Sequence, residues 1–190
     1  KEEYLRREDE INEAVKRDLG LNAYYSYLSG TMNVITEIDL ALRKLDKWTK
    51  PIPVETPIVL FPSKIYDVFE PLGVVLVIGA WNYPIATTLL PVISAIAAGN
   101  CVIAKPSEQA PHTSKVIVDI LNAVDQNCYL GFEGAVPTSV ALNKMAFDLI
   151  VFTGGTFTGK MIMKDASDNL CKVLLELGGK NPTIIDVDAN

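Results

Sequence analysis

Apolar residues recur along this chain in short unbroken runs that alternate with longer segments of helical spacing. The run Val74–Gly79 has the length and β-branched composition of a buried strand. The helix-length segment Ile85–Ala98 and the apolar run Cys101–Ala104 follow it. Parallel strands are buried on both faces and therefore read as continuous apolar runs. This stretch predicts a strand–helix–strand unit with parallel strands.

The same alternation continues downstream. We expect helices at His112–Val124, Pro137–Met145 and Thr158–Ala166, and strands at Cys128–Phe132, Asp148–Gly155, Lys172–Leu177 and Pro182–Val187. Strands that alternate with helices predict an α/β fold with a doubly wound, mainly parallel, Rossmann-like sheet.

The first part of the chain has a different pattern. Apolar positions at helical spacing predict two amphipathic helices, one that reaches Leu19 and one from Tyr24 to Trp48. The proline-rich Lys50–Pro57 ends the second helix, and Pro57–Phe69 predicts two short strands in a β-hairpin. We therefore divide the chain into N-terminal helices packed on the main domain (1–50), a hairpin (51–70) and an α/β domain (71–190).

The stretch Pro71–Ala104 contains no charged residue, which raises the alternative of a membrane span. Residues that interrupt a continuous apolar helix occur throughout it: Gly73, Gly79, Asn82, Pro84, Pro91, Gly99 and Asn100. Prolines and amides fit a lipid-embedded helix poorly. The pattern therefore favours the strand–helix–strand interpretation over the membrane span.

Composition narrows the class of protein. The 190 residues are 49% hydrophobic and 21% charged, with a formal net charge of -6 and no Lys/Arg-rich block, so we expect a globular chain without a nucleic-acid partner. The three cysteines are scattered, and we expect them to be unpaired core residues in a reducing, intracellular and cytoplasmic setting. His112 is the only histidine; we expect it to be solvated, with no metal site and no His-based triad.

Short polar and glycine-containing motifs follow the predicted strands. GAWNYP follows the first strand, KPSE the second, FTGGTFTG the fourth and ELGGK the fifth. Open parallel sheets bind ligands beyond the carboxyl ends of their strands. The four motifs together therefore predict one ligand site at this edge of the sheet.

Residue type alone leaves a structural alternative open for each motif. Asn82 after a strand serves as a turn residue or helix cap, and Lys105 with Glu108 can form a surface ion pair. Glycines after a strand are ordinary turn residues, or they free backbone N–H groups for a phosphate. Glu176 fits either a satisfied core carboxylate or a functional one.

Four motifs resemble those of the aldehyde dehydrogenase superfamily in order and separation. They are WNYP (Trp81–Pro84), KPSE (Lys105–Glu108), FTGGTFTGK (Phe152–Lys160) and LELGGKNP (Leu175–Pro182). The longer segments EPLGVVLVIGAWNYP and AAGNCVIAKPSE are most similar to the class 3 branch, which includes the fatty aldehyde dehydrogenases. The resemblance extends over nearly the whole chain and implies oxidation of aldehydes to carboxylic acids with a nicotinamide cofactor.

The resemblance implies roles for individual residues. Asn82 would donate its amide to the oxyanion of a cysteine thiohemiacetal, and Glu176, in a largely apolar pocket, would be the general base for the deacylating water. Tyr83 would line the substrate tunnel. NAD is the expected cofactor, with NADP as the alternative, because Glu108 would accept from the ribose 2′-OH. The cofactor-binding residues implied are Ala80, Trp81, Lys105, Pro106, Glu108, Gly154, Gly155, Gly159, Leu177 and Gly178.

The sequence departs from the family pattern in three places. Gly155 stands where relatives usually carry serine, and Thr158 where they carry valine. The nucleophile motif, which resembles N-x-G-Q-x-C, does not occur in the 190 residues.

We therefore expect the NAD(P)-binding portion of a longer enzyme, truncated before its catalytic-cysteine domain and inactive alone. The alternative is a truncated, non-catalytic protein that binds nucleotide or dimerises. The resemblance also implies a homodimer in which the hairpin contributes to oligomerisation. Membrane association would come only through an anchor that this chain lacks.

Overall fold

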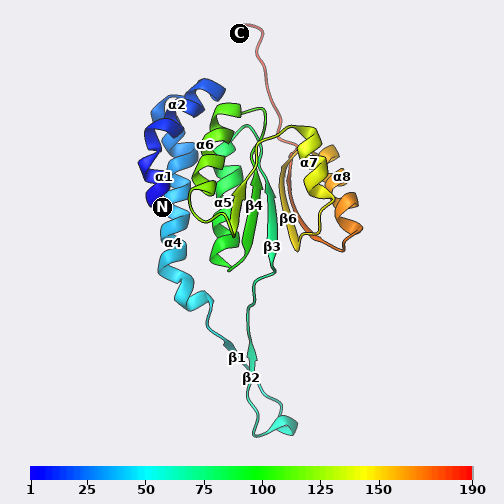
Figure 1. The fold of residues 1–190 in the computed structure, drawn as a ribbon. Coiled ribbons are helices and arrows are strands. Elements are labelled where there is room, and N and C mark those ends of the chain that lie inside the picture. Colours follow the sequence, from blue (N-terminus) through cyan, green and yellow to red (C-terminus); the bar gives the residue numbers. More distant parts are fainter. Residues whose placement is uncertain (190) are drawn as a thin grey trace.

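The computed structural model describes residues 1–189 and contains a five-stranded sheet with helices on both faces (Figure 1). The strands are β3 (Val74–Ile78), β4 (Cys101–Lys105), β5 (Tyr129–Gly131), β6 (Leu149–Gly154) and β7 (Lys172–Leu177), and all neighbouring pairs are parallel. The connecting helices are α5 (Pro84–Ala97), α6 (Pro111–Asn122), α7 (Val136–Asn143) and α8 (Thr156–Ser167). The predicted α/β fold with a doubly wound, parallel, Rossmann-like sheet is confirmed.

The strand order reverses at β3, and this reversal marks one position at the carboxyl edge of the sheet. The order is β5-β4-β3-β6-β7, so the chain starts in the middle, builds outward to β5, and returns to the other side of β3. Ile78 at the end of β3 pairs with Phe152 near the end of β6. The loops after these two strands diverge to opposite faces, and such a reversal is where open α/β sheets bind ligands.

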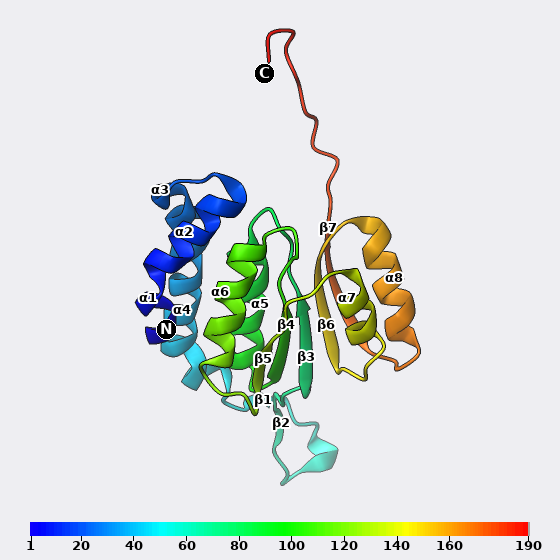
Figure 2. The same ribbon diagram turned by 45° about the horizontal axis from the view of Figure 1, so that its top comes forward.

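Alternate side chains of each central strand feed two separate cores. Val75 and Val77 of β3 join a cluster beneath α5 and α6, whereas Leu76 and Ile78 join a cluster beneath α7 and α8. Figure 2 shows the two helix pairs on opposite faces of the sheet. Burial of the strands on both faces explains why they read as unbroken apolar runs.

The N-terminal helices cover α5 and α6 on one side of the molecule (Figure 2). They are α1 (Glu2–Arg6), α2 (Glu8–Leu19), α3 (Ala23–Ser26), a π-helical turn (Tyr27–Thr31) and α4 (Met32–Trp48). Two helical segments were expected, and each is present but interrupted. The carboxylate of Asp18 accepts hydrogen bonds from the backbone N–H groups of His112 and Thr113, which ties α2 to the start of α6.

The hairpin projects from the end of the sheet at which β3 begins (Figure 1). Its strands, β1 (Ile52–Val54) and β2 (Ile65–Asp67), pair antiparallel. The expected first strand near Pro57 is wrong, because Ile58–Leu60 form a 3₁₀ turn and the strand lies earlier, in the proline-rich segment. Pro53 is tolerated there because a two-stranded ribbon leaves one edge of each strand free.

The segment Pro182–Val187 does not form the strand expected from its apolar residues. It runs away from the sheet after β7 (Figure 1), and Ile184 and Val187 are exposed. A strand requires hydrogen bonding to a neighbouring strand, and within residues 1–189 this segment has none. Local composition alone therefore misidentified it.

The uncharged stretch Pro71–Ala104 contains β3, α5 and most of β4. Among residues 1–189, none of the helices combines the length and the apolar character that crossing a membrane requires.

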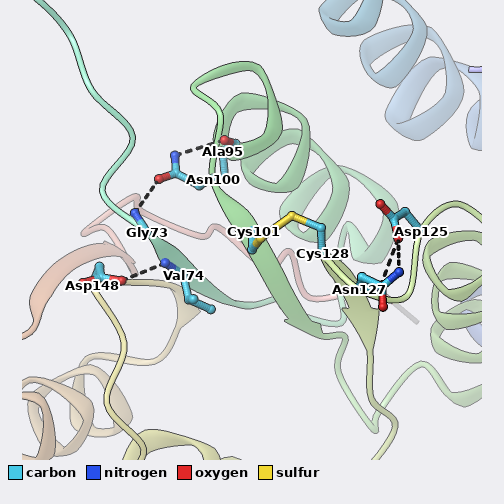
Figure 3. The surroundings of a disulfide bond; sticks show 9 residues. All are labelled: Gly73, Val74, Ala95, Asn100, Cys101, Asp125, Asn127, Cys128 and Asp148. Atoms are coloured by element: carbon cyan, nitrogen blue, oxygen red, sulfur yellow. Dashed lines mark hydrogen bonds between the residues drawn. A yellow bond between two sulfur atoms is a disulfide. The ribbon is translucent and has the colours of Figure 1, made fainter.

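Cys101 and Cys128 form a disulfide, which corrects the expectation of unpaired cysteines (Figure 3). Val102 of β4 pairs with Tyr129 of β5, so the residues that precede them lie side by side. Their Cα atoms are 4.7 Å apart, within the range that a disulfide spans. The sequence separation of 27 residues concealed this proximity, because it depends on which strands become neighbours.

Candidate functional site

A cleft of about 810 Å³ opens at the carboxyl ends of the parallel strands. Ten of the predicted site residues line it: Ala80, Trp81, Asn82, Lys105, Glu108, Gly154, Gly155, Glu176, Leu177 and Gly178. They come from β3, β4, β6, β7 and the segments that follow them. The predicted convergence of the four motifs at one edge of the sheet is therefore present in the structure.

Lys105 is the buried anchor of one wall of the cleft. Its side chain is 1% exposed, and its Nζ donates to the carbonyl oxygens of Pro106 (2.9 Å) and Gly134 (2.8 Å) and to Glu108 Oε2 (3.1 Å). Three acceptors compensate the buried ammonium, which would otherwise be costly. The surface ion pair considered from sequence is wrong for Lys105, because the lysine is enclosed.

Glu108 lies at the open end of this anchor, with 39% of its side chain exposed. Burial raises the pKa of Glu108, but a hydrogen bond from its own backbone N–H and the ammonium of Lys105 outweigh burial and hold the pKa below its ordinary value. Glu108 is therefore a carboxylate at neutral pH. It presents acceptor oxygens to the cleft from a fixed position.

The turn between Ser107 and α6 is held by buried hydroxyl groups. Ser114 Oγ donates to the carbonyl oxygen of Ser107 at 2.6 Å, and the backbone N–H of Gln109 donates to Ser107 Oγ at 3.3 Å. These bonds satisfy backbone groups before the helix begins. They give the Lys105–Glu108 segment a defined path along the cleft.

Thr87 organises the loop that carries Trp81 and Asn82, and the sequence interpretation missed it. Its Oγ1 accepts from the backbone N–H of Ala80 (3.0 Å) and lies within hydrogen-bonding distance of the carbonyl oxygens of Ala80 and Tyr83. Close packing of β3 on α5 also requires a glycine, because a Cβ at Gly79 would collide with Thr88 Oγ1. A threonine one turn into a helix, a position from which its hydroxyl reaches backwards, was the available signal.

Asn82, in the loop after β3, and Glu176, in β7, both line the cleft, and both are exposed. The expectation that Glu176 sits in a largely apolar pocket is wrong for residues 1–189. β7 is the edge strand of the sheet, and its final residues, Glu176 and Leu177, have no further strand beside them. The buried-core alternative for Glu176 is wrong for the same reason.

The turn after β6 directs the start of α8 into the cleft. Gly155 is the N-cap residue of α8, and the next residues that line the cleft are Phe157 and Thr158. The first backbone N–H groups of a helix have no partner within the helix, so they form an anion-binding site. A Cβ at Gly155 would meet no atom within 4 Å, so nothing in the fold demands glycine at this position.

Three predicted site residues lie outside the cleft lining. Gly159 is buried in α8, where an added Cβ would meet Leu177 Cδ2 at 2.8 Å, so it allows α8 to approach β7. Pro106 is buried and contributes its carbonyl oxygen to Lys105. Tyr83 is exposed beside a small hollow between α5 and the π-helical turn.

The cysteines lie away from the cleft. The disulfide joins the beginnings of β4 and β5, at the edge of the sheet opposite the cleft. Cys171 precedes β7, at the end of the strand remote from Glu176. Partial burial, followed by the nearby Asp148, raises the pKa of the Cys171 thiol, and its Sγ lies 3.3 Å from the carbonyl oxygen of Lys172. A thiol with a raised pKa is a poor nucleophile. His112 is exposed, as expected.

Comparison with known proteins agrees with this arrangement. The sequence profile of the aldehyde dehydrogenase family matches residues 1–190. The rat protein "Aldehyde dehydrogenase, dimeric NADP-preferring" is 42% identical over 181 residues, covering 95% of this chain and 40% of that protein. "Aldehyde dehydrogenase family 3 member A2" of Pongo abelii is 42% identical over 185 residues, covering 97% of this chain and 38% of that protein.

A solved structure, "Substrate bound state of Staphylococcus Aureus AldH", superposes with a TM-score of 0.92 at 39% identity. It covers 100% of this chain and 42% of that one. The chain thus spans about two fifths of the length of the relatives it matches.

Proposed function

Because this chain belongs to the aldehyde dehydrogenase family, we propose that it forms the NAD(P)-binding part of an enzyme that oxidises aldehydes to carboxylic acids. The observation that carries the proposal is the convergence of four strand ends on one cleft. Lys105 and Glu108 line one part of this cleft, and Asn82 and Glu176 line another. One ligand can therefore contact both groups.

The cleft fits a dinucleotide in three respects. Its volume of about 810 Å³ is within the range of cofactor pockets. The N-terminus of α8 offers free N–H groups for a diphosphate, and the carboxylate of Glu108 offers acceptors for ribose hydroxyls. When bound, NAD(P)⁺ supplies the hydride acceptor for the oxidation. We propose NAD as the preferred form, because a 2′-phosphate would lie against the charge of Glu108.

Asn82 acts, in this proposal, on the aldehyde oxygen. Attack of a thiolate on the carbonyl carbon moves negative charge to that oxygen, and a fixed amide N–H₂ group stabilises the charge as it develops. Thr87 supports this role, because it holds both ends of the Ala80–Tyr83 loop. Thr87 is therefore a positioning residue for Asn82.

Glu176 acts in the hydrolysis of the acyl-enzyme. Its carboxylate takes a proton from water, and the resulting hydroxide attacks the acyl carbon and releases the carboxylic acid and the thiolate. Exposure of Glu176 at the cleft supports contact with water. The thiolate itself comes from outside residues 1–190, whose three cysteines all lie away from the cleft.

The second candidate, a dimerising protein without catalysis, is favoured by the hairpin. Ile58, Val59 and Phe61 are 93%, 83% and 82% exposed at its tip, and Phe69 is exposed near its base. Apolar residues gathered on a projecting ribbon are typical of protein–protein contacts. We propose that the hairpin contributes to a homodimer, which is compatible with either function.

Titration with NAD tests the cofactor site directly. Trp81 lines the cleft, so binding should change tryptophan fluorescence in the 190-residue chain. Glu108→Gln should weaken binding, and Glu133→Gln, an exposed glutamate outside this cleft, should leave it unchanged. Absence of any NAD binding by the parent chain would refute the proposed site.

Turnover tests the missing nucleophile. The purified 190-residue chain should form no NADH from short or long aldehydes, because its thiols are remote from the cleft. Sustained NADH formation above a heat-treated control would contradict this and direct attention to the three cysteines.

Rapid-mixing kinetics separate the roles of Asn82 and Glu176 in a longer form of the protein that carries a catalytic thiol. Glu176→Gln should keep a burst of NADH and then turn over slowly, about 100- to 10,000-fold down, because the acyl-enzyme forms and waits. Asn82→Ala should lose the burst, with a rate about 100- to 1000-fold down. Equal bursts in both variants would reject at least one assignment.

A further inference from the structure

The end of α6 covers the free edge of β5. Within residues 1–189 the sheet ends at β5, and α6 lies against it (Figure 2). The backbone N–H of Phe132, just after β5, donates to the carbonyl oxygen of Ala104 in β4 at 2.9 Å. Successive residues of a strand direct their backbone groups to opposite sides, so those of Gly131 point away from β4. Such a strand edge normally presents unpaired groups.

The side-chain carboxamide of Asn122, the last residue of α6, takes the place of a neighbouring strand. Its Oδ1 accepts from the backbone N–H of Gly131 at 2.9 Å, and its Nδ2 donates to the carbonyl oxygen of Gly131 at 3.3 Å. A carboxamide carries an acceptor and a donor side by side, so it can satisfy both backbone groups of one residue. Gly131 is buried, and unpaired backbone groups at a buried residue are costly.

Glycine at position 131 allows this contact to form. A Cβ there would meet the backbone Cα of Val118 at 2.8 Å, so α6 can come this close only to a glycine. Val118 and Asn122 are four positions apart in α6 and therefore share one face of the helix. The close approach at Val118 thus brings the carboxamide of Asn122 onto the edge of β5.

The chain leads from this contact to the buried lysine of the cleft. Three residues after Gly131, the carbonyl oxygen of Gly134 accepts from Lys105 Nζ at 2.8 Å. The same ammonium donates to Glu108 Oε2 at 3.1 Å. A displacement of β5 from the sheet would carry the Gly134 oxygen away from Lys105. The ammonium would then lose one of its three acceptors, and Glu108 would lose its fixed position.

We propose that Asn122 is a positioning residue for the cofactor site. By holding Gly131, it keeps the carbonyl oxygen of Gly134 on the ammonium of Lys105, and so keeps the Glu108 carboxylate in place for the ribose. This inference rests on the proposed function and adds to it a residue outside the cleft lining.

A residue that only covers a strand edge would behave differently. Its loss would lower the free energy of unfolding but leave the NAD affinity of the folded chain unchanged. Loss of a positioning residue also raises the apparent dissociation constant, because molecules with a displaced anchor bind the cofactor poorly. The decisive measurement is therefore NAD affinity well below the melting temperature, where each variant is folded.

Titration of the 190-residue chain with NAD, followed by tryptophan fluorescence and calorimetry, provides this measurement. Asn122→Ala should bind NAD about fivefold more weakly, the value of one ordinary hydrogen bond. Asn122→Asp keeps an acceptor for the N–H of Gly131 but loses the donor to its carbonyl oxygen, so its loss should be smaller, about twofold. The aspartate variant, which has nearly the same shape, also serves if the alanine variant does not fold.

Asn127→Ala is the matched control. Asn127 is an exposed asparagine in the loop between α6 and β5, and its side chain donates to Asp125 within the same turn. Its removal should leave the dissociation constant of NAD unchanged.

A double substitution tests the route from Asn122 to the cofactor. In a Lys105→Met background, Asn122→Ala should change the NAD dissociation constant by less than about twofold, because the carbonyl oxygen of Gly134 no longer has an ammonium to hold. A repeat of the full fivefold loss in that background would show that Asn122 acts on binding without Lys105, and would overturn the proposal.

The outcomes separate this proposal from the proposed function. If the parent chain binds no NAD, the cofactor site itself fails. If the parent chain binds NAD and both Asn122 variants bind it equally tightly, the positioning role is overturned while the cofactor site stands. An equal loss of affinity in Asn127→Ala would also overturn it, since any change in this loop would then have the same effect.

Discussion

The two halves of the sheet hold the cleft in different ways. In the half formed by β4 and β5, Lys105 is enclosed by three acceptors, and a disulfide joins the strands at the far end. In the half formed by β6 and β7, the edge strand is half-exposed and Glu176 stands at an open margin. Contacts within the fold therefore fix the side chains of the proposed ribose site, whereas the proposed general base is exposed.

This contrast matches what each half would have to do. A site that recognises an invariant cofactor gains affinity from groups that are already in place before binding. A general base that acts on water needs access to solvent and room to adjust. The difference therefore predicts that substitutions in the β4–β5 half affect stability and binding together. Substitutions at the cleft margin of the β6–β7 half should affect stability little.

The disulfide carries the largest expected effect. Cys101→Ser should lower the free energy of unfolding by about 3 kcal/mol, the loop-closure value for a bridge across 27 residues. Denaturant unfolding with and without dithiothreitol measures it, and reductant should bring the parent chain to the level of the variant. Cys171→Ser, which removes a thiol outside the bridge, is the matched control. An equal free energy of unfolding for the parent chain with and without dithiothreitol would contradict the disulfide.

The second-largest loss of stability is expected for Lys105→Met. The methionine fills similar volume, but the carbonyl oxygens of Pro106 and Gly134 lose their donor, and Glu108 loses its partner. We expect a loss of about 2 kcal/mol in unfolding free energy, because relief of the buried charge offsets part of the cost. NAD binding should fall with it. The surface variant Lys160→Met is the control, and equal unfolding curves for all three proteins would remove Lys105 as an anchor.

How far the sequence predicted these features depends on the range of the interactions. The parallel strands and the motifs at their ends could be predicted, because burial on both faces leaves a local signature in runs such as Val74–Gly79. The strand order could not. The disulfide depends on β4 and β5 being neighbours, and the carbonyl oxygen of Gly134 reaches Lys105 across 29 positions. Such pairings carry no periodic pattern.

The errors have the same origin. Pro182–Val187 was predicted as a strand from composition, but a strand exists only beside a partner. The resemblance implied an apolar pocket around Glu176, yet β7 lies at the edge of the sheet within residues 1–189. The surroundings of both depended on tertiary position, which sequence spacing does not encode.

Glu108→Gln should narrow the preference for NAD over NADP by about 1 kcal/mol. It removes one charge-assisted contact with a ribose hydroxyl and one repulsion against a 2′-phosphate. Paired fluorescence titrations with the two cofactors measure the ratio, and Glu133→Gln should leave it unaltered. An unchanged ratio in Glu108→Gln would remove this carboxylate from the ribose site.

The acid dependence of stability offers an independent check on Glu108. Its pKa in the folded chain lies below the ordinary value, so ionised Glu108 contributes stability above the ordinary pKa. That contribution is lost as the pH falls through the folded pKa. The difference in unfolding free energy between the parent chain and Glu108→Gln should therefore shrink on acidification. A difference that grows on acidification would mean that burial, not Lys105, dominates.

Glu176→Gln tests the other half of the comparison. Its carboxylate is exposed and has no hydrogen bond within residues 1–189, so the unfolding free energy should change by less than about 0.5 kcal/mol. Glu70→Gln, an exposed substitution near the hairpin, sets the scale. A loss comparable to that of Lys105→Met would show that the two halves are equally constrained.

The smallest effect is expected at the turn after β6, where two glycines with different surroundings can be compared. Gly155 is the N-cap of α8 with open space around it, so Gly155→Ser should stabilise the chain by a few tenths of a kcal/mol through an N-cap hydrogen bond. NAD affinity should rise no more than about threefold, because the added hydroxyl is one neutral donor. Gly159→Ser is the contrasting substitution, since its Cβ would press on Leu177 and should destabilise by about 1 kcal/mol or more. Thermal melts and NAD titrations of both variants decide whether Gly159 serves packing or the diphosphate. A Gly159→Ser variant that is stable but has lost NAD binding would assign Gly159 to the ligand. A Gly159→Ser variant that is unstable, but whose folded fraction still binds NAD, would assign Gly159 to the contact between α8 and β7.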